Sequence, residues 1–128
     1  MLPVRLFLFV QIVLLAGFGL AYFIRPQETA NLSGMLLMEP AAVTDVRAYY
    51  GGLQLGLAVW LGLALLRGDL LRPALMLLVL LYASLFLGRL GGLFLDGGAQ
   101  QTFNLYAMLV ELVSALLAFW LLRRSTPT

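Results

Sequence analysis

The amino-acid sequence predicts an all-α integral membrane protein, an antiparallel four-helix bundle formed by a single domain of residues 1–128. Hydrophobic residues make up 62% of the chain and charged residues only 11%, whereas a soluble domain carries about a quarter charged residues. With so few charges, most of the surface must face a medium other than water. Four apolar stretches are long enough to cross roughly 30 Å of hydrocarbon, which takes about 20 helical residues.

The predicted spans follow one another with short polar breaks, and they cover about residues 3–24, 46–66, 73–95 and 103–122. Arg25-Pro26 ends the first span, and Pro73, a favoured residue at a helix start, begins the third. Thr44 or Asp45 is the expected N-cap of the second span. The first span is too long for the apolar core of a signal peptide and no clean cleavage site follows it, so we expect it to be retained.

The distribution of arginine predicts that both termini lie on the cytoplasmic side, because cytoplasmic flanks retain positive charge. The flanks on that side carry Arg5, Arg67, Arg72, Arg123 and Arg124. On the opposite side, the last loop, "DGGAQQT", has no basic residue.

The first loop, residues 25–45, is longer than the usual connection between helices and is expected outside the membrane. It contains the apolar stretch "SGMLLMEP". Two alternatives remain open: this stretch lies in the interface or folds back as a lid over the bundle, or the loop merely dips into the headgroups.

Two opposite charges, Arg89 and Glu111, lie well inside the third and fourth spans. With a rise of about 1.5 Å per residue, Arg89 lies roughly 9 Å and Glu111 roughly 12 Å below the outer ends of their antiparallel helices. A lone charge there costs about 2.5–3.5 kcal/mol. We therefore expect an ion pair in which the guanidinium fork meets both carboxylate oxygens, either as part of a site or as a structural clasp.

The second span adds polar residues at similar depth. Arg47, Tyr50, Gly51 and Gln54 follow one another at helical spacing and are expected to share a face. In the last two spans, Asp96 follows Arg89 by one heptad and Asn104 precedes Glu111 by one, so both are expected to support the pair.

Two G-x-x-x-G patterns, Gly52 with Gly56 and Gly88 with Gly92, flank these polar residues. Such spacing lets helix backbones approach closely, and packing is the default interpretation, with space for a ligand as the alternative.

The chain has no cysteine and no histidine, and all eight basic residues are arginine. Thiolate chemistry and imidazole-ligated haem or zinc are therefore not available to it. We predict no catalytic residue, no metal ligand and no cofactor, because the spans contain no nucleophile–base constellation and no metal-ligand set. The net charge of +2 is modest and scattered, which argues against nucleic-acid binding.

The segments "RAYYGGLQLGL" and "LGRLGGLFLDG", with the glutamate of "YAMLVELVSALLAF", resemble a family of small four-helix bacterial inner-membrane proteins. That family is catalogued as a domain of unknown function and is grouped with the DoxX/DoxD-like membrane proteins. The resemblance covers nearly the whole chain and implies a four-helix bundle in the bacterial inner membrane with its termini on one side. The positions it marks are Arg47, Tyr50, Gly51, Gly52, Gly56, Arg89, Gly91, Asp96 and Glu111. Some wider relatives are subunits linked to quinone-dependent oxidation or to maturation of redox enzymes.

These observations predict a membrane protein that binds an amphiphile such as a lipid, a fatty acid or a quinone-like molecule in the outer half of the bundle. Arg47 and Arg89 would hold its acidic or carbonyl head, Tyr50 and Gln54 would donate hydrogen bonds, and Glu111 would orient Arg89. Two alternatives give these polar residues another role. In one, the chain is an accessory or assembly subunit of a homo-oligomer or larger membrane complex, and the cluster is structural. In the other, it is a small proton-coupled transporter.

Overall fold

The computed structural model describes residues 2–97 and 101–125. All regular structure in these residues is helical, and four helices are long and apolar enough to cross a membrane, as predicted: Leu2–Ile24, Pro40–Leu66, Gly68–Asp96 and Thr102–Arg124. The chain divides into two compact units, Leu2–Gly68 and the part from Asp69 onward, and each is described by itself.

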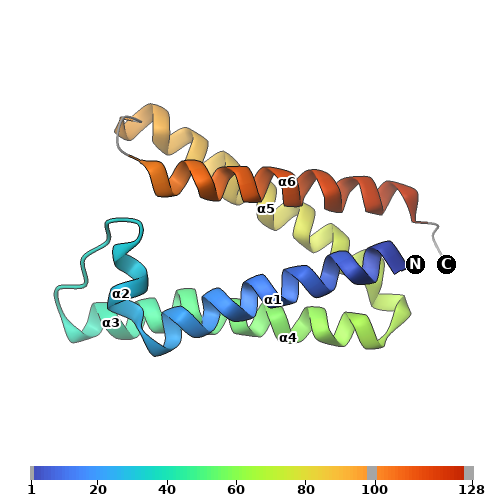
Figure 1. The fold of residues 1–128 in the computed structure, drawn as a ribbon, viewed down its shortest axis with the longest axis horizontal. Coiled ribbons are helices and arrows are strands. Elements are labelled where there is room, and N and C mark those ends of the chain that lie inside the picture. Colours follow the sequence, from blue (N-terminus) through green and yellow to red (C-terminus); the bar gives the residue numbers. More distant parts are fainter. Residues whose placement is uncertain (1, 98–100, 126–128) are drawn as a thin grey trace. The chain divides into compact units, whose positions relative to one another are not determined.

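In the unit Leu2–Gly68, α1 (Leu2–Ile24) and α4 (Leu53–Leu66) run antiparallel and side by side (Figure 1). The second membrane-length helix is continuous through α3 (Pro40–Val46), a π-helical turn η1 (Arg47–Gly52) and α4. The buried residues of α1 recur every three or four positions, as one packed helical face requires; they are Val4, Leu8, Gln11, Leu15, Gly19 and Tyr22.

The predicted N-cap of the second span was wrong, since the helix begins at Pro40 and its N-cap is Glu39 rather than Thr44 or Asp45. Glu39, in extended backbone, precedes Pro40, whose fixed φ suits the first helical position. No side-chain hydrogen bond caps this helix.

The first loop is also more ordered than the sequence predicted, because residues 26–31 form a short helix, α2 (Pro26–Asn31). Gly34, with φ of +83°, ends this helix in a left-handed turn that favours glycine. The backbone N–H of Met35 donates to the Ala30 carbonyl and that of Gly34 to the Asn31 carbonyl, which satisfies two carbonyls of α2.

The apolar stretch after Gly34 alternates between two environments. Met35 and Leu37 pack against a buried cluster formed by Tyr22, Ala30 and Val46. Leu36 and Met38 between and beyond them are 72% and 82% exposed. One edge of the loop is therefore packed on its own unit, and the other presents apolar side chains outward.

The second unit is a helical hairpin. A short 3-10 turn η2 (Gly68–Leu70) leads into α5 (Leu71–Asp96), which packs against the antiparallel α6 (Thr102–Arg124) (Figure 1). The buried residues of α6 again recur at helical spacing, and they are Met108, Glu111, Ser114, Ala118 and Leu121.

Arginine side chains cover the carboxyl ends of neighbouring helices within each unit. Arg5 on α1 donates to the Leu65 carbonyl at the end of α4. Arg47 Nε donates to the Phe23 carbonyl at the end of α1, at 2.9 Å. In the second unit, Arg72 Nη1 donates to the carbonyls of Leu122 at 2.8 Å and Ser125 at 2.7 Å. The last carbonyls of a helix lack partners inside the helix and carry partial negative charge, so a guanidinium is a suitable cap.

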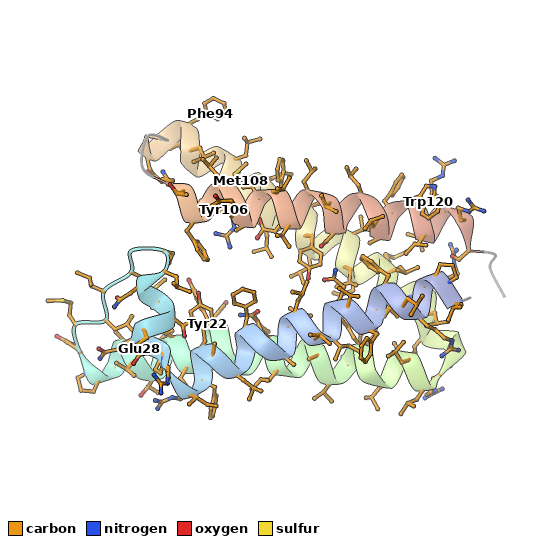
Figure 2. All side chains as sticks on the ribbon, viewed as in Figure 1. Tyr22, Glu28, Phe94, Tyr106, Met108 and Trp120 are labelled. Carbon is orange, nitrogen blue, oxygen red and sulfur yellow. The ribbon has the colours of Figure 1, made fainter. Side chains whose placement is uncertain are left out.

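The surface of this protein is apolar, unlike that of a soluble protein, and its mainly apolar interior also holds a few polar side chains. Large apolar side chains are exposed along all four long helices, and Phe94 and Trp120, labelled in Figure 2, are among them. Polar Gln11, Glu111 and Ser114 are buried. This arrangement fits helices surrounded by hydrocarbon.

Candidate functional site

The centre of the candidate site is an ion pair between Arg89 on α5 and Glu111 on α6. Arg89 Nε donates to Glu111 Oε2 at 2.9 Å and to Oε1 at 3.1 Å. The predicted pair is therefore confirmed, although its geometry differs from the expected fork. One nitrogen meets both carboxylate oxygens, and the rest of the guanidinium points elsewhere.

Asn104 on α6 accepts a further hydrogen bond from Arg89, through the terminal nitrogen Nη1. Arg89 Nη1 donates to Asn104 Oδ1 at 2.6 Å, and Asn104 Nδ2 donates to Gln101 Oε1 at 2.7 Å. Gln101 Nε2 donates in turn to the Gly97 carbonyl at 2.6 Å. A continuous chain of hydrogen bonds thus runs from Glu111 to the end of α5.

Sequence reasoning missed two members of this cluster, Gln101 and Phe103. The Arg89 guanidinium carbon lies 5.9 Å from the centre of the Phe103 ring, within the range of a cation–π contact. A glutamine three residues before Asn104 at the start of a helix is a usable signal, since those positions are helical neighbours. The contact of Phe103 depends on how α5 and α6 cross, and the sequence carries no signal for it.

The two charges of the pair differ in burial. The Glu111 side chain is only 7% exposed, whereas 29% of the Arg89 side chain is accessible. The hydrogen bonds of Arg89 within the described residues use Nε and Nη1, so the N–H groups of Nη2 remain as donors. The carboxylate is thus enclosed, and one edge of the guanidinium is not.

Asp96 does not join the cluster, although it was predicted to support it. It is exposed at the last residue of α5. Its Oδ2 atom lies 3.5 Å from the place where a Cβ would stand at Gly92. The side chain therefore leans back along its own helix. Tyr82, seven residues before Arg89 on the same helix, is buried.

The predicted site residues of the second span belong to the other unit, where each has a local contact. Arg47 donates to the Phe23 carbonyl, and its guanidinium carbon lies 5.9 Å from the centre of the Phe23 ring. The ring of Tyr50 meets the ring of Tyr22 edge-on, with the centres 5.1 Å apart. Gln54 Nε2 donates to the Tyr50 carbonyl at 2.8 Å, one turn earlier in its own helix.

The expectation that these residues share an α-helical face needs correction. Arg47, Tyr50 and Gly51 lie in the π-helical turn η1, which has more residues per turn than an α-helix. The backbone N–H of Leu53 donates to the Ala48 carbonyl, five residues earlier. Gly51 is buried against α1, whereas Tyr50 is exposed.

The close helix contact of this unit is made by a different glycine pair from the one predicted. A Cβ at Gly51 would stand 3.0 Å from the backbone nitrogen of Phe23, and one at Gly19 would stand 3.1 Å from the Gly51 carbonyl oxygen. Apart from the neighbouring turns of their own helix, the nearest described atom would be 4.0 Å away at Gly52, and none would lie within 4 Å at Gly56. Gly88 and Gly91 likewise meet no described atom within that distance.

Among the residues that the structure describes, no group of three or more histidine, cysteine, aspartate or glutamate side chains is placed to hold a metal ion. The chemistry that the cluster offers is therefore hydrogen bonding and charge from Arg89, oriented by Glu111 and Asn104.

Four long apolar helices with apolar outer surfaces and a buried glutamate paired with arginine define a multi-pass helical membrane protein. Residues 3–122 match the family described as Domain of unknown function (DUF4345), and the chain belongs to this family. No match was found among curated proteins or among solved structures.

Proposed function

We propose that this protein binds the polar head of an amphiphilic molecule, a lipid, a fatty acid or a quinone-like compound, through Arg89. The proposal places the chain in the bacterial inner membrane, as a single four-helix domain with both termini in the cytoplasm. It also includes the relationship to DoxX/DoxD-like membrane proteins. The positive-inside distribution of arginine and the family resemblance support these parts.

The observation that carries the binding proposal is the unequal exposure of the ion pair. Glu111 is enclosed and holds Arg89 through Nε, while the guanidinium stays partly accessible and its Nη2 donors have no acceptor among the described residues. Between apolar helices, guanidinium N–H groups that face hydrocarbon without an acceptor are unfavourable, so the accessible edge of Arg89 favours an acceptor beside it. A guanidinium that is fixed in orientation by Glu111 can donate hydrogen bonds from its accessible N–H groups to an oxygen atom of a ligand.

Charge balance indicates which head group fits best. Arg89 is already neutralised by Glu111, so an anionic head would leave one uncompensated negative charge in a poorly solvated place. A carbonyl or hydroxyl oxygen accepts the same hydrogen bonds without adding charge. The cluster therefore favours an uncharged head such as a quinone carbonyl, an ester or an amide over a free carboxylate.

We also propose that the head group contacts three residues of the second span, Arg47, Tyr50 and Gln54. The support for this is the sequence argument that they lie at a depth similar to that of Arg89 and Glu111. Arg47 uses only Nε within the described residues, which leaves its terminal nitrogens as donors. Gly51, Gly52, Gly56, Asp96 and Asn104 are proposed to support the site. Among these, Asn104 has the most direct support, since it accepts a hydrogen bond from Arg89.

The test uses palmitamide and palmitic acid, a matched pair of single-chain amphiphiles that differ in head-group charge. Protein in nanodiscs is incubated with each, and bound ligand is measured by native mass spectrometry. The wild type should retain palmitamide better than palmitate. Arg89→Leu should lower retention of palmitamide about tenfold, because a hydrogen bond to a charged group contributes about 1.5–3 kcal/mol. Arg25→Leu is the matched control, since Arg25 pairs with Glu28 at an exposed position.

Arg89→Leu also leaves Glu111 buried without its partner, so a second variant separates binding from folding. The exchange Arg89→Glu with Glu111→Arg keeps an ion pair between α5 and α6 but moves the guanidinium to the other helix. We expect it to fold and to lose the ligand. Unchanged retention in both this variant and Arg89→Leu would refute the binding proposal.

A second candidate is an accessory or assembly subunit in which the cluster only holds α5 and α6 together. It is favoured by the finding that, among the described residues, no buried side-chain nitrogen or oxygen lacks a hydrogen-bond partner. In that case the exchanged pair should retain full function and full association with a membrane partner or with further copies of the chain. Affinity purification from native membranes would then recover a stoichiometric complex without bound amphiphile.

A further inference from the structure

The last turn of α6 carries two adjacent arginines, each lying over an aromatic ring one helical turn earlier. The Arg124 guanidinium carbon is 4.9 Å from the centre of the Trp120 ring, and that of Arg123 is 5.9 Å from the centre of the Phe119 ring. Both distances lie within the range of a cation–π contact. These four residues are called here the terminal arginine–aromatic cluster.

Both rings belong to the outer surface of the helix. Phe119 is 48% and Trp120 is 51% exposed, and Figure 2 shows Trp120 near the carboxyl end of α6. Since α6 is long and apolar enough to cross a membrane, its final turn lies where the helix leaves the hydrocarbon. Tryptophan is enriched at that level of the bilayer, beside the phosphates of the lipids.

The stacking leaves the hydrogen-bonding capacity of the two arginines available. A cation–π contact is made by the charge of the guanidinium and uses none of its N–H donors. Within the described residues neither Arg123 nor Arg124 takes part in a hydrogen bond or an ion pair. The rings thus hold the charges in place without neutralising them.

The carboxyl end of a helix would ordinarily repel an anion, because its last carbonyls carry partial negative charge. Here Arg72 donates to the carbonyls of Leu122 and Ser125, next to the cluster. A third arginine therefore offsets the negative end of α6. The only acidic residue of α6 itself, Glu111, is more than two turns away and is paired with Arg89.

We propose that the terminal arginine–aromatic cluster binds the phosphate of an anionic phospholipid. The two guanidinium groups would donate to the phosphate oxygens, and the acyl chains would lie along the exposed rings of Phe119 and Trp120. This site shares no residue with the Arg89 cluster and does not depend on the function proposed for it.

The test measures lipid selectivity of the full chain in vesicles that contain equal amounts of phosphatidylglycerol and phosphatidylcholine. The protein is extracted with its nearest lipids in styrene–maleic acid particles, and the ratio of the two lipids is measured by mass spectrometry. The wild type should be enriched several-fold in phosphatidylglycerol. The double variant R123Q/R124Q should reduce this ratio to that of the bulk membrane, whereas R25Q, which removes an exposed arginine elsewhere, should not change it.

A second double variant, F119L/W120L, keeps both charges but removes the rings that hold them. It should lower the enrichment substantially, and helix content measured by circular dichroism should match that of the wild type. Three results would overturn the proposal: no enrichment in the wild type, equal loss in R25Q, or full enrichment in F119L/W120L. The last would show that charge alone, without the stacked arrangement, attracts the lipid.

Discussion

Arg89 shows how much one residue can be understood from its helix and its depth. A guanidinium inside an apolar span needs an acceptor, and Glu111 is the carboxylate at matching depth on the antiparallel neighbour. The sequence was sufficient to predict this pair. It was not sufficient to predict that Nε alone would meet both oxygens while Nη1 turned to Asn104.

The glycines illustrate the opposite case at the same scale. Spacing favoured Gly52 and Gly56 as packing residues, whereas the tight approach is made by Gly19 and Gly51. Several glycines lie close together along η1 and α4, and spacing alone does not distinguish which of them faces α1. The π-helical turn changes the rotation per residue at this point, which turns Gly51 toward Phe23.

Replacing Gly51 by alanine should therefore destabilise the unit Leu2–Gly68. Its new Cβ would lie 3.0–3.1 Å from backbone atoms of Phe23, which cannot rotate away as a flexible side chain can. We expect a loss of about 1–3 kcal/mol, typical of overpacking, measured by thermal unfolding in detergent. Gly56→Ala is the matched control, because no described atom beyond the neighbouring turns of its own helix lies within 4 Å of its Cβ position. Equal stability of the two variants would contradict this contact.

At the scale of elements, the helices of each unit are tied to one another by arginines at their ends. Arg5 and Arg47 bind the carboxyl ends of α4 and α1, and Arg72 binds that of α6. Each bond joins the start of one helix to the end of its antiparallel neighbour. A guanidinium offers five donors in a fixed plane, so it can meet several carbonyls at once, which a single ammonium group does less well. Arg72 uses this capacity, since it donates to the carbonyls of both Leu122 and Ser125.

The first loop is the element on which the sequence was least informative. Proline at the start of α2 and of α3 favours a helix start at each place, but α2 has only six residues and is too short to show an apolar period. The segment between them, residues 35–38, alternates between packed and exposed side chains. Only its packing against Tyr22, Ala30 and Val46 decides which side chains lie inward.

Single cysteines at positions 35 to 38 test this alternation, since the chain has no native cysteine. Leu36→Cys and Met38→Cys should react several-fold faster with a soluble maleimide in detergent than Met35→Cys and Leu37→Cys. In vesicles, a fluorophore at Leu36→Cys should be quenched by doxyl-labelled lipids if the loop lies in the interface. Uniform reactivity across the four positions would mean that the observed packing of the loop is wrong.

For the whole molecule, the decisive feature is an apolar surface around an interior that is mainly apolar but holds a few polar side chains. The outer faces of the long helices are apolar, and the buried positions include glutamine, glutamate and serine. Hydrocarbon around the helices removes the penalty for exposed leucine and raises the penalty for an unpaired charge. The same reasoning explains why the buried carboxylate of Glu111 is paired with Arg89.

The proposed orientation is tested on the whole chain in intact cells with a membrane-impermeant maleimide. Ser33→Cys in the first loop should be labelled from outside, and Gly68→Cys between α4 and α5 should be labelled only after permeabilisation. The physical reason is the excess of arginine on the flanks that include Arg67 and Arg72. The cysteine-free wild type is the background control, and the reverse labelling pattern would show that the termini lie outside.

The sequence by itself determined that this is a helical membrane protein with four spans and that two opposite charges lie at matching depth. These properties depend on composition and on the constant rise of a helix, both of which are local. The tertiary structure decided which carbonyls are capped by Arg5, Arg47 and Arg72. It also decided which glycines are in close contact and how the first loop packs. Those outcomes depend on the rotation and crossing of helices distant in sequence, which packing between their side chains sets and local periodicity does not.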